Sequence, residues 1–227
     1  MIVVDNNSWY VNSVSLTRKK LLHYISLLFS TIVIIFLFVY QLYSSDIKAM
    51  FFKTSNGQFK TETQSEYYKR INKTDRQITY DHLSTIGVNI LQVTPVIGAI
   101  LTRNALMYVT YSGAIVITAP VIAFTKKFIK EARPDDDSSL TSFPSGHALF
   151  AFLSATIYTL HAAHRYKQIT SICAFLLATF VAIGRVMAKR HWCIDVICGG
   201  IIGIAIAMLT TYIVHKMNSH MFQNQHN

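Results

Sequence analysis

The stretch CIDVICGGIIGIAIAMLTTYIV, residues Cys193–Val214, decides the fold. Its 22 residues include one charged side chain, that of Asp195. A helix of about 20 apolar residues matches the roughly 30 Å hydrocarbon core of a bilayer, so the sequence predicts a membrane-spanning helix here. Gly199, Gly200 and Gly203 favour close packing of this helix on a neighbour, because small residues let helix backbones approach each other in lipid.

Five other apolar runs have the same character and also predict spanning helices: Leu21–Tyr43, Leu83–Leu101, Ala105–Thr125, Ser145–Ala163 and Ile169–Met187. Pro95 and Pro120 lie inside two of them and predict kinks, since neighbouring helices can satisfy the carbonyls that a proline frees. The first run exceeds the roughly 7–15 apolar residues of a signal peptide and no small-residue cleavage site follows it, so we expect a retained anchor.

The predicted fold class is therefore all-α, a polytopic membrane bundle of six transmembrane helices. We expect residues 1–227 to form a single integral membrane domain, with residues 44–81 as its one long extramembrane loop. Aromatic residues interspersed in that loop leave open whether it lies in the membrane interface or is solvated.

Composition excludes a soluble globule. Hydrophobic residues make up 52% of the chain and charged residues 14%, with a mean hydropathy of +0.34, whereas a soluble domain is about a quarter charged. A net charge of +10 and a pI near 9.6 indicate an anionic partner: nucleic acid, acidic lipid or a phosphate-bearing substrate. Nucleic acid is disfavoured, because no soluble segment carries a basic stripe with interleaved aromatics. Three cysteines in apolar stretches predict no disulfide framework.

The orientation in the membrane rests on two opposed signals. Six spans place both termini on one side, with seven of the basic residues there and fourteen on the other side, a count that would put the termini outside. Arg18, Lys19 and Lys20 directly precede the first span and instead favour a cytoplasmic N-terminus. We favour the cytoplasmic N-terminus, because several of the fourteen are candidate functional residues and do not report topology.

Three clusters of polar residues lie near predicted span ends, on the side opposite the termini. The first is KKFIKEARP, residues Lys126–Pro134. Proline disfavours helix at the preceding residue, so we expect the helix to end near Arg133. On a helix of that length, Lys126, Lys130 and Arg133 form one basic stripe. Snorkelling of long cationic side chains to the interface is the plain alternative.

The second cluster is FPSGH, residues Phe143–His147, directly before an apolar run. Proline at a first helical position marks a helix start, and we place Pro144 there. Free backbone N–H groups and the positive end of the helix dipole suit an anion such as phosphate. Gly146 would let that anion approach the backbone closely.

The third cluster is GRVMAKRHWCID, residues Gly184–Asp195, between the last two predicted spans. His191 and Asp195 are four residues apart, which would put them on one helical face. A carboxylate can hold one imidazole nitrogen protonated and leave the other free to attack an electrophile. A purely structural interfacial pair is the alternative.

In combination, the three clusters resemble the signature of the type 2 phosphatidic acid phosphatase superfamily. The order is Lys-x6-Arg-Pro, Pro-Ser-Gly-His and Arg-x5-His-x3-Asp, over residues 126–195. That superfamily includes lipid phosphatases, undecaprenyl-pyrophosphate phosphatases and vanadium haloperoxidases. One position departs from the pattern: the third motif of the family usually opens with serine before the arginine, and here Gly184 precedes Arg185.

The resemblance implies roles for the motif residues. His191 would attack phosphorus to form a phosphohistidine, Asp195 would orient it, and His147 would protonate the leaving oxygen. The residues implied to bind the phosphate are Lys126, Arg133, Ser145, Gly146 and Arg185. Phosphoryl transfer depends mainly on positioning and on neutralising oxygen charge, so three cations and a helix N-terminus can replace metals, and we expect neither metal nor cofactor.

The resemblance thus implies a metal-independent lipid phosphatase of the bacterial cytoplasmic (inner) membrane, with its site facing the periplasm or exterior. The candidate substrates are lipid A phosphate, undecaprenyl pyrophosphate, phosphatidylglycerol phosphate and phosphatidic acid. The motifs recognise only the phosphate, and they leave the oligomeric state open.

Three other interpretations concern a metal site, transport and lipid binding without catalysis. The acidic run Asp135–Asp137 suits Mg²⁺, although such runs are more often solvated loops. A transporter or channel is disfavoured, because the ionisable residues gather at one membrane face and do not line a path. A non-catalytic lipid-phosphate-binding protein has the same motifs and stays open.

Overall fold

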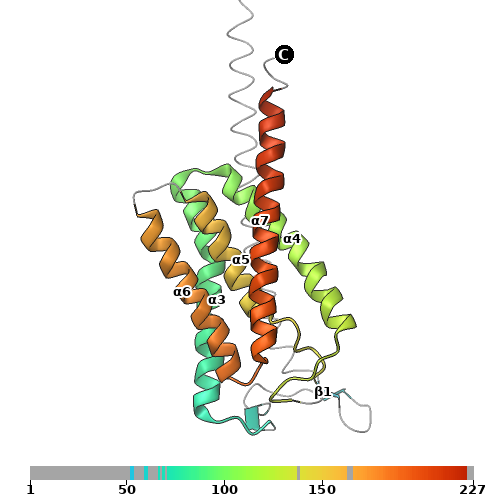
Figure 1. Ribbon diagram of the computed structural model, residues 1–227. Helices are drawn as coiled ribbons and strands as arrows, with labels where there is room; N and C mark the ends of the chain where they lie inside the picture. The colour runs from blue at the N-terminus through green and yellow to red at the C-terminus, as the bar shows by residue number, and fades with distance from the viewer. Residues whose placement is uncertain are drawn as a thin grey trace, which may run out of the picture.

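The computed structural model describes residues 52–53, 59–60, 66, 68–69, 71–136, 139–162 and 166–223. Five helices lie in this part of the chain (Figure 1): α3 Asp75–Thr102, α4 Ala105–Phe128, α5 Gly146–His161, α6 Lys167–Met187 and α7 Cys193–Gln223. Before them, β1 (Phe52–Lys53) and β2 (Phe59–Lys60) form a two-residue antiparallel ladder. The predicted span Leu21–Tyr43 lies outside the described residues.

The described helices form a membrane bundle, and the chain is an integral membrane protein. Helices α3, α4, α6 and α7 are long and apolar enough to cross a bilayer. Large apolar side chains point outward at helical spacing, as Ile169, Ile172, Leu176 and Ile183 do on α6, each more than half exposed. Side chains of this kind on an outer face suit contact with lipid. The all-helical bundle is confirmed for these residues, and the count of six spans stays a prediction.

Helix α5, of 16 residues, lies at the centre of the bundle and packs against α3, α6 and α7 (Figure 1). One of its faces carries Leu149, Leu153 and Ile157, fully buried in a cluster that includes Tyr108 of α4. The small side chain of Ala155 on another face packs into a second cluster with residues of α3 and α6. Packing on these sides fixes the position of α5, and with it the position of the helix's N-terminal end.

Glycines bring α7 directly against α5. A Cβ atom at Gly199 would lie 2.6 Å from the Ser145 carbonyl oxygen, and one at Gly203 would lie 2.3 Å from the Leu149 carbonyl oxygen. Real Cβ atoms do not approach that closely, so any larger residue would push the helices apart. The close packing predicted from the glycines of this run is confirmed.

The structure corrects two predicted helix boundaries next to the motifs. Helix α4 ends at Phe128, where the Ile129 N–H still donates to the Thr125 carbonyl, so Arg133 lies in a loop and the predicted basic stripe is wrong. Helix α5 begins at Gly146, so Pro144 precedes the helix and does not occupy its first position. The reason is the Ser145 hydroxyl, which accepts from the Ala148 N–H and makes serine the N-cap.

Two further boundaries differ from the sequence prediction. Helix α7 begins at Cys193, so His191 precedes the helix and does not share a helical face with Asp195. Helix α3 begins at Asp75, inside the predicted loop, because Thr74 and Gln77 form a capping box. The first two turns of α3 therefore extend beyond the apolar run and carry polar residues into the bundle.

Candidate functional site

The predicted site residues lie at one end of the bundle, where α4 and α6 end and α3, α5 and α7 begin (Figure 1). They come from four segments: the last turn of α4, the loop after it, the start of α5, and the stretch from the end of α6 to the first turn of α7. In chain order they are Lys126, Arg133, Ser145, Gly146, His147, Arg185, His191 and Asp195. Tertiary structure thus gathers side chains that the sequence holds in three separate motifs.

His191 and Asp195 face each other in a buried setting. The Nδ1 atom of His191 lies 3.6 Å from Oδ2 of Asp195, a little longer than a hydrogen bond, and the two side chains are 3% and 0% exposed. The same Oδ2 accepts from the Ser142 hydroxyl at 2.5 Å and from the Trp192 N–H at 2.9 Å. The carboxylate is therefore fixed in place by two donors, and Ser142 is a residue that the motifs did not indicate.

The setting keeps the His191 imidazole neutral. Burial lowers its pKa from 6.5 to about 3, and the positive charges of Arg185, Arg133 and Lys126 act in the same direction, against the effect of Asp195. A neutral imidazole keeps a lone pair at physiological pH. Since Nδ1 faces the carboxylate, Nε2 is the nitrogen available to attack.

Three cations lie near enough to this imidazole to lower its pKa. Arg133 and Arg185 are 7% and 5% exposed, and the Nε atom of Arg185 is buried without a hydrogen-bond partner among the described residues. Lys126 donates from Nζ to the Thr141 carbonyl oxygen at 2.5 Å. Gathering buried positive charge is costly unless an anion offsets it, so the site suits a ligand with several anionic oxygens.

The start of α5 is only partly available to a ligand. The Ser145 N–H donates to the Asp195 carbonyl oxygen at 3.1 Å and the Ser145 hydroxyl caps the helix, so both groups are engaged by the protein. A Cβ at Gly146 would meet its nearest neighbour, Ile122 Cδ1, at 3.9 Å, so protein packing alone does not require glycine there. Close approach of a ligand to the backbone would be a reason for glycine at position 146.

His147 is oriented by helix α3. Its Nε2 atom lies 3.4 Å from the Thr85 hydroxyl oxygen. That hydroxyl gives its own hydrogen to the Asp81 carbonyl oxygen at 2.9 Å, so towards His147 it acts as an acceptor. The contact therefore favours a hydrogen on Nε2 of His147.

An ion-pair network behind Arg185 was missed by the sequence analysis. Asp81 of α3, 4% exposed, accepts from Arg185 Nη1 at 2.5 Å and from Arg190 Nε at 2.7 Å. The Tyr68 hydroxyl donates to it at 3.2 Å, and Lys73 Nζ lies 3.5 Å away. The sequence carries a signal, because a carboxylate near an apolar run is a functional candidate, but residues 44–81 are predicted to be a loop that Asp81 ends.

Asp135, the first residue of the acidic run, belongs to the same network. Its Oδ2 lies 3.1 Å from Lys73 Nζ and 3.7 Å from Arg190 Nη1, while Asp137 lies outside the described residues. Burial and Arg190 lower the pKa of Lys73 to about 8, against the opposing effects of Asp81 and Asp135, so Lys73 is mostly charged at pH 7. Asp135 thus faces two cations, an arrangement expected of an ion-paired carboxylate.

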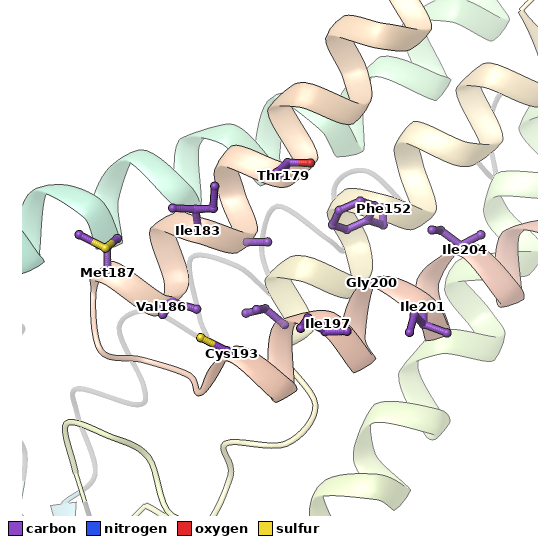
Figure 2. Close-up of a pocket in the computed structure, with 12 residues that line it drawn as sticks. Phe152, Thr179, Ile183, Val186, Met187, Cys193, Ile197, Gly200, Ile201 and Ile204 are labelled. Atoms are coloured by element: carbon purple, nitrogen blue, oxygen red, sulfur yellow. The ribbon is translucent and has the colours of Figure 1, made fainter.

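A groove of about 470 Å³ opens between α6 and α7 beside the site (Figure 2). Val186, Met187 and Cys193 line one end, next to Arg185 and His191 in the chain, and Ile201 and Ile204 line the other. Its remaining lining residues are Phe152, Thr179, Ala182, Ile183, Val196, Ile197 and Gly200. An apolar groove thus runs from the charged end of the bundle along the membrane-spanning part of two helices.

Comparison with known proteins places this geometry in a family. Lipid A 1-phosphatase of Porphyromonas gingivalis is 37% identical over 81 residues, which are 36% of this chain and 18% of that protein's length. The crystal structure of Aquifex aeolicus LpxE is similar with a TM-score of 0.49 at 22% identity, over 64% of this chain and 93% of that chain. The family model of the PAP2 superfamily matches residues 104–219, more than half of the chain and all the predicted site residues, so the protein belongs to the PAP2 superfamily.

Proposed function

We propose that the protein removes phosphate from a membrane lipid, as a monoester or diphosphate hydrolase, through a phosphohistidine intermediate and without a metal. One observation carries this proposal: a buried, neutral His191 faces Asp195 and feels the positive charges of Lys126, Arg133 and Arg185. A nucleophile and three cations are what transfer of a phosphoryl group requires.

In the first step, Nε2 of His191 attacks phosphorus, a P–N bond forms and the bond from phosphorus to the lipid oxygen breaks. His147 gives its proton to that oxygen, and Asp195 stabilises the positive charge that develops on the His191 ring. Lys126, Arg133 and Arg185 offset the charge on the other phosphate oxygens. In the second step, His147 takes a proton from water, the water attacks phosphorus, and the P–N bond breaks to release phosphate and free His191.

The groove supports a lipid as the substrate. It is apolar and ends beside the residues that flank Arg185 and His191, so an acyl chain lying in it would present a headgroup phosphate to the cations (Figure 2). The relative from Porphyromonas gingivalis makes lipid A phosphate the first candidate, before undecaprenyl pyrophosphate, phosphatidylglycerol phosphate and phosphatidic acid.

Phosphate release from these four lipids, with the purified full-length protein in detergent micelles containing EDTA, tests the reaction. We expect release from at least one of them, loss of it in His191→Ala, and no loss in His215→Ala, an exposed histidine on α7. Labelling with ³²P-phospholipid should trap an acid-labile, base-stable phosphoenzyme in the wild type alone. Binding of lipid phosphate without any release would favour the non-catalytic reading, and a requirement for Mg²⁺ would overturn the proposed chemistry.

Acyl-chain binding in the groove has its own test. Ile197→Trp places a large ring in the groove, whereas Ile213→Trp adds the same ring at an exposed position of α7 outside it. We expect the first variant alone to raise KM for a long-chain lipid phosphate, with little change for a short water-soluble phosphate ester. Equal effects on both substrates would contradict binding of the acyl chain in the groove.

We also propose that the site faces the periplasm or cell exterior. Lys130, exposed in the loop beside the site, and Lys216, exposed near the other end of α7, mark the two sides. In intact cells with a permeable outer envelope, and in a background in which Cys173, Cys193 and Cys198 are replaced by alanine, a membrane-impermeant maleimide should label Lys130→Cys and not Lys216→Cys. The reverse pattern would place the site in the cytoplasm.

A further inference from the structure

Helix α3 lies outside the stretch matched by the PAP2 model, yet it touches the site from behind. Asp81 and Ser84 are one turn apart on its inward side, and they are 4% and 0% exposed. Polar groups are buried at this depth only where they find partners. Both find the same partner atom, Nη1 of Arg185.

The Ser84 hydroxyl acts as an acceptor towards that arginine. It donates its own hydrogen to the Asp81 carbonyl oxygen at 2.9 Å, and its oxygen lies 3.4 Å from Arg185 Nη1. The Asp81 carboxylate accepts a hydrogen bond from the same Nη1 at 2.5 Å. One nitrogen of the guanidinium is thus held by α3, while the buried Nε has no hydrogen-bond partner among the described residues and remains for a ligand.

Gly184 leaves the space that Ser84 fills. A Cβ at position 184 would lie 2.9 Å from the Ser84 Cβ, 3.4 Å from the Tyr80 carbonyl oxygen and 3.6 Å from the Ser84 hydroxyl oxygen. Side chains at 84 and 184 therefore compete for one small volume next to Arg185. Gly184 is also the position at which the third motif departs from the family pattern.

We propose that Ser84 is a positioning residue of the active site: from α3 it provides, beside Arg185, the hydroxyl that position 184 lacks, and Gly184 is required because Ser84 is present. Together with Asp81, it fixes the guanidinium in the orientation that binds phosphate. The proposal rests on the function proposed above only for its effect on turnover, since the effect on phosphate binding is independent of it.

Four variants form the test: Ser84→Ala, Ser84→Gly, Gly184→Ser and the exchange Ser84→Gly/Gly184→Ser. Thr94→Ala, a hydroxyl of α3 that only bonds the carbonyl of its own helix, is the matched control. Steady-state kinetics give kcat and KM, and the affinity for inorganic phosphate comes from the thermal shift that phosphate produces. Melting temperature without phosphate reports folding separately.

Removal of the hydroxyl in Ser84→Ala should weaken phosphate affinity and kcat/KM about 3- to 10-fold, as expected for loss of one long hydrogen bond to a guanidinium that Asp81 still holds, with the melting temperature near that of the wild type. Gly184→Ser alone should lower phosphate affinity and kcat/KM more than Ser84→Ala does, because the added Cβ meets the Ser84 side chain. The exchange should recover phosphate affinity to within about twofold of the wild type and exceed both of its parent single variants, as coupled neighbours can.

Three results would overturn the proposal. They are wild-type phosphate affinity in Ser84→Ala, an exchange variant no better than the poorer of its parents, and a loss in Thr94→Ala equal to that in Ser84→Ala. If the wild type releases no phosphate from any lipid, the proposed function fails. The phosphate affinities still decide the role of Ser84, because they need no turnover.

Discussion

Asp81 should be the most sensitive single charge in the described part of the protein. Asp81→Asn keeps the size of the side chain and removes its charge, which takes away the carboxylate that Arg185, Arg190 and Lys73 share, while Asp135 still faces Lys73 and Arg190. All four side chains are at most 12% exposed, so solvent screens them poorly. Breaking a buried ion pair from one side costs about 3–5 kcal/mol, because the partner charge stays buried.

For a chain of this size, that loss corresponds to a fall in melting temperature of roughly 6–20 °C. The assay is thermal unfolding of the purified protein in detergent micelles, followed by circular dichroism. Asp75→Asn is the control, since Asp75 is exposed in the first turn of the same helix and its carboxylate contributes only about 0.3–1 kcal/mol there. A melting temperature for Asp81→Asn within about 2 °C of the control would refute the reasoning that the network is buried and mutually dependent.

Three other predictions concern helix packing, the carboxylate and pH. Gly203→Ala should destabilise the protein by about 1–3 kcal/mol in thermal unfolding, because its Cβ meets a carbonyl of α5, while Gly113→Ala, whose Cβ would meet its neighbour at 3.4 Å, should change little; equal losses would contradict the packing argument. Ser142→Ala should lower kcat about tenfold with little change in KM, since Asp195 loses a donor, and unchanged kcat would count against it. The pKa of His191 is about 3 in the folded protein against 6.5 ordinarily, so the unfolded chain binds the extra proton between these values and stability falls as pH drops from 6.5 towards 3. The melting temperature of the wild type should therefore fall more between pH 7 and pH 4 than that of His191→Asn, and parallel curves would disprove the shift.

Much of the site could be predicted from the sequence because its residues lie in three compact motifs next to helix ends. The apolar runs predicted the helices, and the polar clusters between them predicted that His147, His191 and Asp195 lie near one membrane face. Boundaries were less accurate: the basic stripe was wrong because α4 ends at Phe128, where apolar periodicity gives no stop signal. The predicted start of α5 at Pro144 was wrong, because Ser145 caps the helix and the helix begins at Gly146.

The contacts that site residues make with side chains far away in the chain could not be predicted from the sequence. Ser142 and Asp195 are 53 residues apart, and Arg190 and Asp81 are 109 apart, so no local spacing relates them. Nothing in the sequence relates Ser84, in a predicted span, to Gly184, a departure from a motif, because only the packing of α3 on α6 places them next to each other.

The sequence by itself determined that this protein lies in a membrane and which residues are the candidates for its chemistry, because helix length, hydropathy and motif spacing are local properties of the chain. The tertiary structure alone decided which side of α3 faces Arg185 and how tightly α7 meets α5 at Gly203. The physical reason is that helix rotation and crossing are fixed by packing between distant segments, and those contacts place Asp81 and Ser84 behind the cation that is expected to hold phosphate.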